Sequence, residues 1–100
     1  IVSKNPATAY LLNLNAGKVE FYPKGGSALL TSKMTLIANR WWHVAAAYNG
    51  TSTNIYINGE LDTASTSITG AIGTNTDSLR IGCDLSGGFP ATSSMVSLMK

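Results

Sequence analysis

Apolar and polar residues alternate along much of the chain, and this pattern predicts short β-strands. Within Ala9–Asn15, every second position is occupied by Tyr10, Leu12 or Leu14, so these three side chains share one face of a strand. A short turn follows, after which Val19–Tyr22 alternates again. The two runs therefore predict a β-hairpin, and no comparable stretch favours a helix.

The segment 41–59 contains two further apolar runs, joined by a polar turn and closed by Asn58 and Gly59. Both of these closing residue types tolerate positive φ, which the two-residue turn of a tight hairpin requires. Ile55–Ile57 should therefore fold back onto the run that begins at Glu60. Three consecutive antiparallel strands are expected from this part of the chain.

Additional short strands are expected on both sides of this segment. Ile1–Lys4 and Ser78–Gly82 read as strands, and Ala28–Ser32 and Thr35–Ala38 read as two strands broken near Lys33. The Ser-, Thr-, Gly- and Asn-rich stretch that precedes the last strand predicts a long loop. About seven short strands, with turns about ten residues apart, indicate an all-β antiparallel sandwich.

Two tryptophans stand side by side at the start of segment 41–59. Because neighbouring residues in a strand point to opposite faces, Trp41 and Trp42 are expected on opposite sides of one strand. At least one of the two indoles should therefore lie off the main core.

Composition limits the function classes. With 100 residues, of which 44% are hydrophobic, the chain accounts for one domain or part of one. Only 12% of the residues are charged and the net charge of +2 comes from scattered residues, so nucleic acid is not an expected partner. Cys83 is the single cysteine, which excludes an internal disulfide. No apolar run approaches the ~20 residues of a membrane span, so membrane insertion is not expected.

Spaced motifs carry a resemblance to a known family. They are Trp41-x-His43-Val44-Ala45, Tyr48-Asn49-Gly50, Tyr56-Ile57-Asn58-Gly59 and Leu79-x-Ile81-Gly82. In this order they resemble the laminin G-like domains of the concanavalin A-like lectin and glucanase superfamily. The resemblance covers about residues 1–82 and implies a jelly-roll β-sandwich. Asn49 and Asn58 stand where the family usually has Asp, which keeps the turn geometry but removes two carboxylates.

The same resemblance indicates that the domain is incomplete at both ends. The family has strands before the position of Ile1 and a closing strand that reads roughly Phe-x-Gly-x-Ile-Asp-Glu-Val. We therefore divide the chain into residues 1–90, the central part of the sandwich, and residues 91–100, an atypical tail. One codon choice for Thr92 to Lys100, read two bases later, gives Phe-Ile-Asn-Gly-Phe-Ala-Asp-Glu, so we hypothesise a frameshifted tail. A sandwich that lacks strands exposes sheet edges that can pair with other chains.

Catalysis is not expected. Glucanases of the superfamily use a strand with the pattern Glu-x-Asp-x-x-Glu, whose two glutamates act on the glycosidic bond. Glu60 and Asp62 match the first half of this pattern, but residue 65 is a serine and no second glutamate follows. Without that acid, nothing is in place to protonate the leaving oxygen.

Metal binding has one candidate pair. His43 is the only histidine, which leaves a histidine cluster without partners, and its place in the motif predicts a core position. Several laminin G-like domains hold calcium through loop oxygens. By that resemblance, Asp77 and Asp84 are the candidate calcium ligands.

Aromatic residues provide the better lead to function. Sugars dock their apolar faces on aromatic rings while amide side chains bond their hydroxyls, so the candidate ligand-binding residues are Trp42, Tyr56, Tyr22 and Asn58. We expect a recognition module in a larger extracellular, cell-surface or virion protein, with a glycan or another protein surface as partner. The alternatives are a structural or adhesive spacer in a bacterial surface or viral particle protein and, less favoured, a glucanase fragment.

Overall fold

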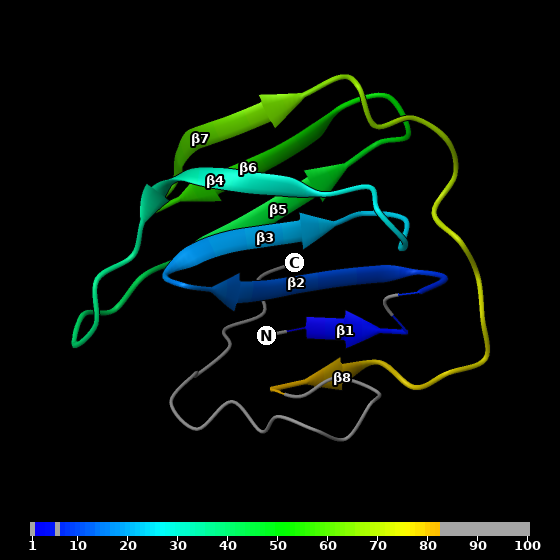
Figure 1. Cartoon of the computed structure of the whole chain (residues 1–100), viewed down its shortest axis with the longest axis horizontal. Coiled ribbons are helices and arrows are strands. Elements are labelled where there is room, and N and C mark those ends of the chain that lie inside the picture. The colour runs from blue at the N-terminus through cyan, green and yellow to red at the C-terminus, as the bar shows by residue number, and fades with distance from the viewer. Residues whose placement is uncertain (1, 6, 83–100) are drawn as a thin grey trace.

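The computed structural model describes residues 2–5 and 7–82. Within these ranges the chain forms strands only, arranged as two antiparallel sheets (Figure 1). The larger sheet has the order β4-β3-β2-β1-β8, and the smaller has the order β5-β6-β7. The strands are β1 (Val2–Lys4), β2 (Tyr10–Asn15), β3 (Lys18–Tyr22), β4 (Leu30–Thr35), β5 (Val44–Tyr48), β6 (Thr53–Ile57), β7 (Glu60–Ser65) and β8 (Arg80–Ile81). The prediction of an all-β antiparallel sandwich of jelly-roll type is confirmed.

The two predicted hairpins close through two-residue turns in which both residues have positive φ. Ala16 and Gly17, at φ 49° and 80°, connect β2 to β3. Asn58 and Gly59, at φ 51° and 81°, connect β6 to β7. Two successive positive φ values match the right-handed twist of the flanking strands, so both hairpins close within two residues.

The core lies between the two sheets. Its buried members are Val19 and Phe21 of β3, Leu30 of β4, Ile55 and Ile57 of β6, and Ile68 of the loop after β7. The members from one strand are two residues apart, so they share the inward face while the residues between them point outward. This alternation fixes the register, since a slip by one residue would turn the apolar set to solvent.

Strand β4 differs from the sequence prediction. Two short strands were expected with a break near Lys33, but β4 runs through this residue without interruption. The irregularity lies instead in the pairing with β3, where the register shifts. There the Ser32 hydroxyl accepts from the Val19 N–H at 3.0 Å and donates to the Met34 carbonyl at 2.8 Å. A side chain thus replaces main-chain partners and lets the strand continue.

The start of β5 also differs. Trp41 and Trp42 were expected inside the strand, but β5 begins only at Val44, and the expected position of His43 in the core is wrong because its side chain is exposed. The last predicted strand, Ser78–Gly82, shortens to the two residues of β8. The tail 91–100 and Asp84 lie outside the described residues.

Loops gather at the two ends of the sandwich (Figure 1). One end, on the left of the view, holds the β2–β3 turn, the β4–β5 loop and the β6–β7 turn. The other end holds the β5–β6 turn, which meets the long loop that leaves β7 and leads to β8. Within the described residues no helix is long and apolar enough to cross a membrane.

Candidate functional site

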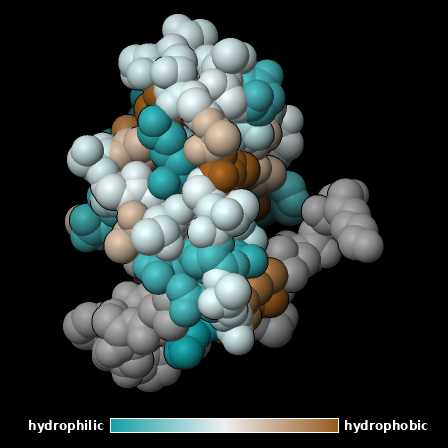
Figure 2. Space-filling view, turned by 90° about the vertical axis from the view of Figure 1, so that its right-hand side faces the viewer, coloured by the Kyte–Doolittle hydropathy of each residue, from teal (hydrophilic) through white to brown (hydrophobic). Residues whose placement is uncertain are grey.

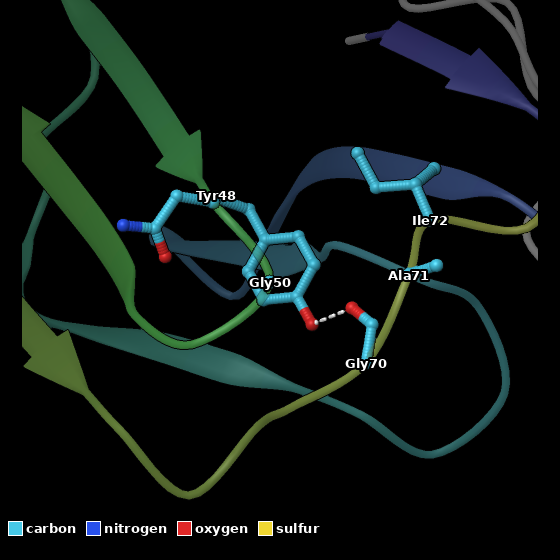
Figure 3. A pocket seen from close by; sticks show the side chains of 6 residues that line it. Tyr48, Gly50, Gly70, Ala71 and Ile72 are labelled. Atoms are coloured by element: carbon cyan, nitrogen blue, oxygen red, sulfur yellow. Dashed lines mark hydrogen bonds between the residues drawn. The ribbon is translucent and has the colours of Figure 1, made fainter.

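A cavity of about 300 Å³ opens where the β5–β6 turn meets the β7–β8 loop (Figure 3). It is lined by Tyr48, Asn49, Gly50, Gly70, Ala71 and Ile72. The Tyr48 ring reaches across from the end of β5, and its hydroxyl donates to the Gly70 carbonyl (Figure 3). The lining therefore combines one aromatic ring, one isoleucine and one asparagine with three small residues, and it contains no charged side chain.

The β7–β8 loop is tied down at several points near this cavity. The Gly70 N–H donates to the Gly50 carbonyl at 3.0 Å, and the Lys24 ammonium donates to the Thr69 carbonyl. Further along the loop, a Cβ added at Gly73 would lie 1.7 Å from the Thr8 carbonyl oxygen. Only glycine permits such an approach, so the loop lies tightly against the β1–β2 connection.

The polar groups of the cavity are largely paired within the protein. Asn49 Oδ1 accepts from the main-chain N–H groups of Thr51 and Ser52 at 3.0 and 2.8 Å, which holds the β5–β6 turn. The Tyr48 hydroxyl is likewise paired with Gly70. Figure 2, a view of this end of the molecule, shows a mostly polar or neutral surface with hydrophobic residues in small separate patches. The residues that line the cavity include neither a nucleophile paired with a base nor a pair of acids.

The four candidate ligand-binding residues do not form one site, and none of them lines the cavity. Tyr22 alternates with the buried Phe21 and so belongs to the outer side of the larger sheet. Tyr56 alternates with the buried Ile55 and Ile57 and belongs to the outer side of the smaller sheet. Burial, followed by the charge and hydrogen bond of neighbouring Glu20, raises the pKa of the Tyr22 hydroxyl. The two tyrosines thus face opposite surfaces of the sandwich.

Trp42 lies in the β4–β5 loop and is part of the scaffold there. Its half-buried indole packs against the core, and Nε1–H donates to the Ile37 carbonyl at 3.1 Å. The guanidinium carbon of Arg40 lies 5.1 Å from the centre of its ring, a cation–π distance. These contacts hold the β4–β5 loop in place.

Trp41, which the candidate set omitted, is 78% exposed. The sequence indicated that one indole of the pair would lie off the core, but it did not tell which. The choice depends on the loop conformation before β5, because the alternation of a strand does not extend to residues 41–43. No local signal separates the two tryptophans.

Asn58 lies at the same end of the molecule as the two tryptophans. Its Oδ1 accepts from the main-chain N–H of His43 at 3.0 Å, and its own N–H donates to the His43 carbonyl at 2.8 Å. The β6–β7 turn is thereby fixed two residues from Trp41. Of the four candidates, the structure brings together Trp42 and Asn58 at one end, here called the aromatic end and defined as residues 37–43 with Asn58 and Gly59.

Of the two acidic candidates, Asp77 makes a structural contact. Asp77 Oδ2 accepts from Asn5 Nδ2 at 2.8 Å, across 72 residues of sequence. In the described part of the chain no three His, Cys, Asp or Glu side chains gather as metal ligands. Because Asp84 lies outside the described residues, the calcium hypothesis stays a prediction.

The half-match to the glucanase pattern also has a structural explanation. Glu60 is exposed at the start of β7. The Asp62 carboxylate is occupied by main-chain N–H groups of β4, at 2.6 Å from Lys33 N and 3.0 Å from Met34 N. Asp62 therefore connects β7 to β4 through hydrogen bonds.

Comparison with known proteins agrees with this architecture. A laminin G family model, described as the concanavalin A-like lectin/glucanases superfamily, matches residues 1–98. The chain therefore belongs to the laminin G-like domains of this superfamily, as the spaced motifs predicted. No curated protein and no solved structure matches the chain. The fold and family define a binding module of a class that is generally non-catalytic. The frameshift hypothesis for the tail stays a prediction.

Proposed function

We propose that this domain is a non-catalytic carbohydrate-binding module whose ligand docks at the aromatic end. The observation that carries the proposal is the 78% exposed indole of Trp41, held beside a packed Trp42. An indole left in water on a positioned loop provides a flat apolar surface, and the apolar face of a pyranose ring is its natural complement.

The surroundings of Trp41 supply what such a site needs in addition. The loop is positioned by the Trp42–Ile37 hydrogen bond and by the stacking of Arg40 on Trp42, so little conformational entropy is lost on binding. Asn58, with its Oδ1 held by His43, leaves its Nδ2 as an amide donor for sugar hydroxyls. In this proposal the module acts at an extracellular, cell or virion surface, as part of a larger protein.

A glycan array tests the proposal with the full chain, in the presence and absence of calcium. We expect glycan binding by the wild type and at least a tenfold loss of affinity in W41A, which corresponds to about 1.4 kcal/mol. The matched control is L61A, because Leu61 is also highly exposed, at 57%, but lies on the outer side of the smaller sheet. That control should bind normally.

Two results would contradict the proposal. Absence of binding to every glycan, with and without calcium, would favour a structural or adhesive spacer. Hydrolysis of a β-glucan by the chain would contradict the non-catalytic assignment.

A further inference from the structure

Two Asn-Gly pairs, Asn49–Gly50 and Asn58–Gly59, lie in turns at opposite ends of the smaller sheet. The carboxamide carbon of an asparagine, Cγ, can be attacked by the main-chain nitrogen of the residue that follows. Glycine has no Cβ to shield that nitrogen or to restrict the rotation that the attack requires. A difference in reactivity between the two pairs in the folded protein therefore depends on what holds each turn.

The Asn49–Gly50 pair is held on both sides of the peptide bond that must rotate. Asn49 Oδ1 accepts from the main-chain N–H groups of Thr51 and Ser52, at 3.0 and 2.8 Å, and from the Thr51 hydroxyl at 3.0 Å. The Gly50 carbonyl accepts from the Gly70 N–H at 3.0 Å. The β7–β8 loop also lies against this glycine (Figure 3), since a Cβ added at Gly50 would be 3.7 Å from the Gly70 carbonyl oxygen. Rotation here would break several hydrogen bonds.

The Asn58–Gly59 pair is held by fewer contacts. Within the described part of the chain, the Asn58 side chain makes one hydrogen bond, from the His43 N–H to Oδ1 at 3.0 Å, and its Nδ2 has no partner. Among the same residues, neither the N–H nor the C=O of Gly59 is hydrogen-bonded. Both residues of the pair are exposed, and a Cβ added at Gly59 would meet no atom within 4 Å. Fewer hydrogen bonds therefore oppose rotation at Asn58 than at Asn49.

We propose that Asn58 is a site of spontaneous deamidation in the folded protein, and that the β5–β6 turn protects Asn49 from the same reaction. In the first step the Gly59 nitrogen loses its proton to solvent and attacks Asn58 Cγ. The N–Cγ bond forms, the Cγ–Nδ2 bond breaks, and Nδ2 takes a proton from solvent and leaves as ammonia. The product is a cyclic succinimide.

The second step needs only water. Addition of water at Cγ breaks the new N–Cγ bond and gives aspartate. Addition at the main-chain carbonyl carbon of residue 58 breaks the bond from that carbon to the Gly59 nitrogen and gives isoaspartate. Neither step oxidises or reduces the chain. Each product carries a carboxylate in place of the carboxamide, which lowers the formal net charge from +2 to +1.

The two products differ in their effect on the hairpin. Aspartate keeps an oxygen that accepts from the His43 N–H, so the β6–β7 turn is retained. Isoaspartate places an additional methylene in the main chain of a two-residue turn, so the pairing of Ile57 with Glu60 is disturbed. Both products lack Nδ2, the amide donor assigned to sugar hydroxyls. Glycan affinity at the aromatic end should therefore fall as the protein ages, a consequence that rests on the proposed function.

Incubation of the full chain at mildly alkaline pH, followed by peptide mapping with tandem mass spectrometry, measures the rate at each asparagine. In the folded chain we expect Asn58 to convert about tenfold faster than Asn49, because rotation at Asn49 breaks more hydrogen bonds. In concentrated urea neither turn is formed, so the two rates should become similar.

Two conservative variants isolate the two sites. N49D and N58D each keep an acceptor oxygen in the turn and each leave one Asn-Gly pair in the chain. Folded N49D should accumulate acidic product on anion exchange at the wild-type rate. Folded N58D is the matched control and should do so about tenfold more slowly.

Three results would overturn the proposal. They are conversion of Asn49 as fast as Asn58 in the folded chain, the same ratio of the two rates in urea as in the folded chain, and an intact Asn58 over a period in which the urea-unfolded chain converts. Glycan binding by N58D separates this proposal from the proposed function. Wild-type affinity of N58D would contradict the role of Nδ2 as a sugar donor without changing the measured deamidation rates.

Discussion

The Asp62 carboxylate in β7 accepts a hydrogen bond from the main-chain N–H of Lys33 in β4, at 2.6 Å. The Met34 N–H donates to the other carboxylate oxygen at 3.0 Å, and the Thr63 hydroxyl donates at 2.6 Å. Because β4 and β7 belong to different sheets, these bonds close one side of the sandwich. The β6–β7 pairing opposes Ile55 to Thr63 and Tyr56 to Leu61, which leaves Asp62 as the extra residue of a bulge and redirects its side chain.

Replacing Asp62 by asparagine should lower the free energy of unfolding by about 1–2 kcal/mol. The carboxamide keeps one acceptor oxygen, but its NH₂ group faces a main-chain donor where the second carboxylate oxygen stood. Urea denaturation of D62N and the wild type measures the change. The control is E60Q, because Glu60 is exposed at the start of the same strand and removing its charge should change stability by less than about 0.5 kcal/mol. Equal losses of unfolding free energy in D62N and E60Q would contradict a stabilising role of the hydrogen bonds between Asp62 and β4.

The same carboxylate predicts a pH dependence. Burial alone raises the pKa of Asp62, but the Thr63 hydroxyl, the two β4 N–H groups and the Lys33 charge outweigh it, so the pKa lies below its ordinary 3.8. A group whose pKa is lower in the folded state stabilises the fold above its unfolded-state pKa, and this contribution is lost as pH falls through the folded-state value. Unfolding free energies measured between about pH 6 and 2 should therefore fall more steeply below pH 4 in the wild type than in D62N. Parallel curves would show that Asp62 does not contribute.

The parts of the fold that the sequence predicted correctly are local. At Asn58 and Gly59 both turn residues are of types that accept positive φ, so this turn can be read from residue type. The first hairpin follows from the alternating runs on either side of its turn. The inward faces of β3 and β6 likewise follow from alternation within a single strand. Such features need no knowledge of distant contacts.

The features that escaped prediction depend on distant partners. A strand break was expected near Lys33. The Ser32 hydroxyl instead accepts a hydrogen bond from the Val19 N–H, and β4 continues through Lys33. Asp62 resembled half of a catalytic pattern, but its partners lie 28 and 29 residues away in β4. At the aromatic end, the half-buried position of Trp42 and the exposure of Trp41 are set by the path of the whole loop. A pattern within one strand carries no information on these contacts.

Asn58 combines two roles that substitutions can separate. Its φ of 51° is costly for most residues, and its Oδ1 accepts from the His43 N–H. N58G keeps the turn conformation and loses only the acceptor, so we expect a loss of about 1 kcal/mol in the free energy of unfolding. N58A loses the acceptor and also strains the backbone at positive φ, so its free energy of unfolding should be about 1–2 kcal/mol lower than that of N58G. Thermal or urea unfolding measures the order of stability of the wild type, N58G and N58A. Equal stability of the two variants would show that backbone strain is not a factor at this position.

Replacement by alanine should destabilise the fold at Trp42 but have little effect on stability at Trp41. Trp42 packs against the core and donates to Ile37, so W42A should lower the free energy of unfolding by about 2–3 kcal/mol, below the cost of a fully buried tryptophan. Trp41 is 78% exposed, so W41A should change stability by less than about 0.5 kcal/mol. Because the chain has two tryptophans, each variant retains a single tryptophan, whose fluorescence is followed. Acrylamide should quench W42A, which keeps Trp41, more strongly than W41A, provided that quenching is measured below the unfolding transition of both variants. Equal quenching would contradict the exposure of Trp41, on which the proposed glycan site depends.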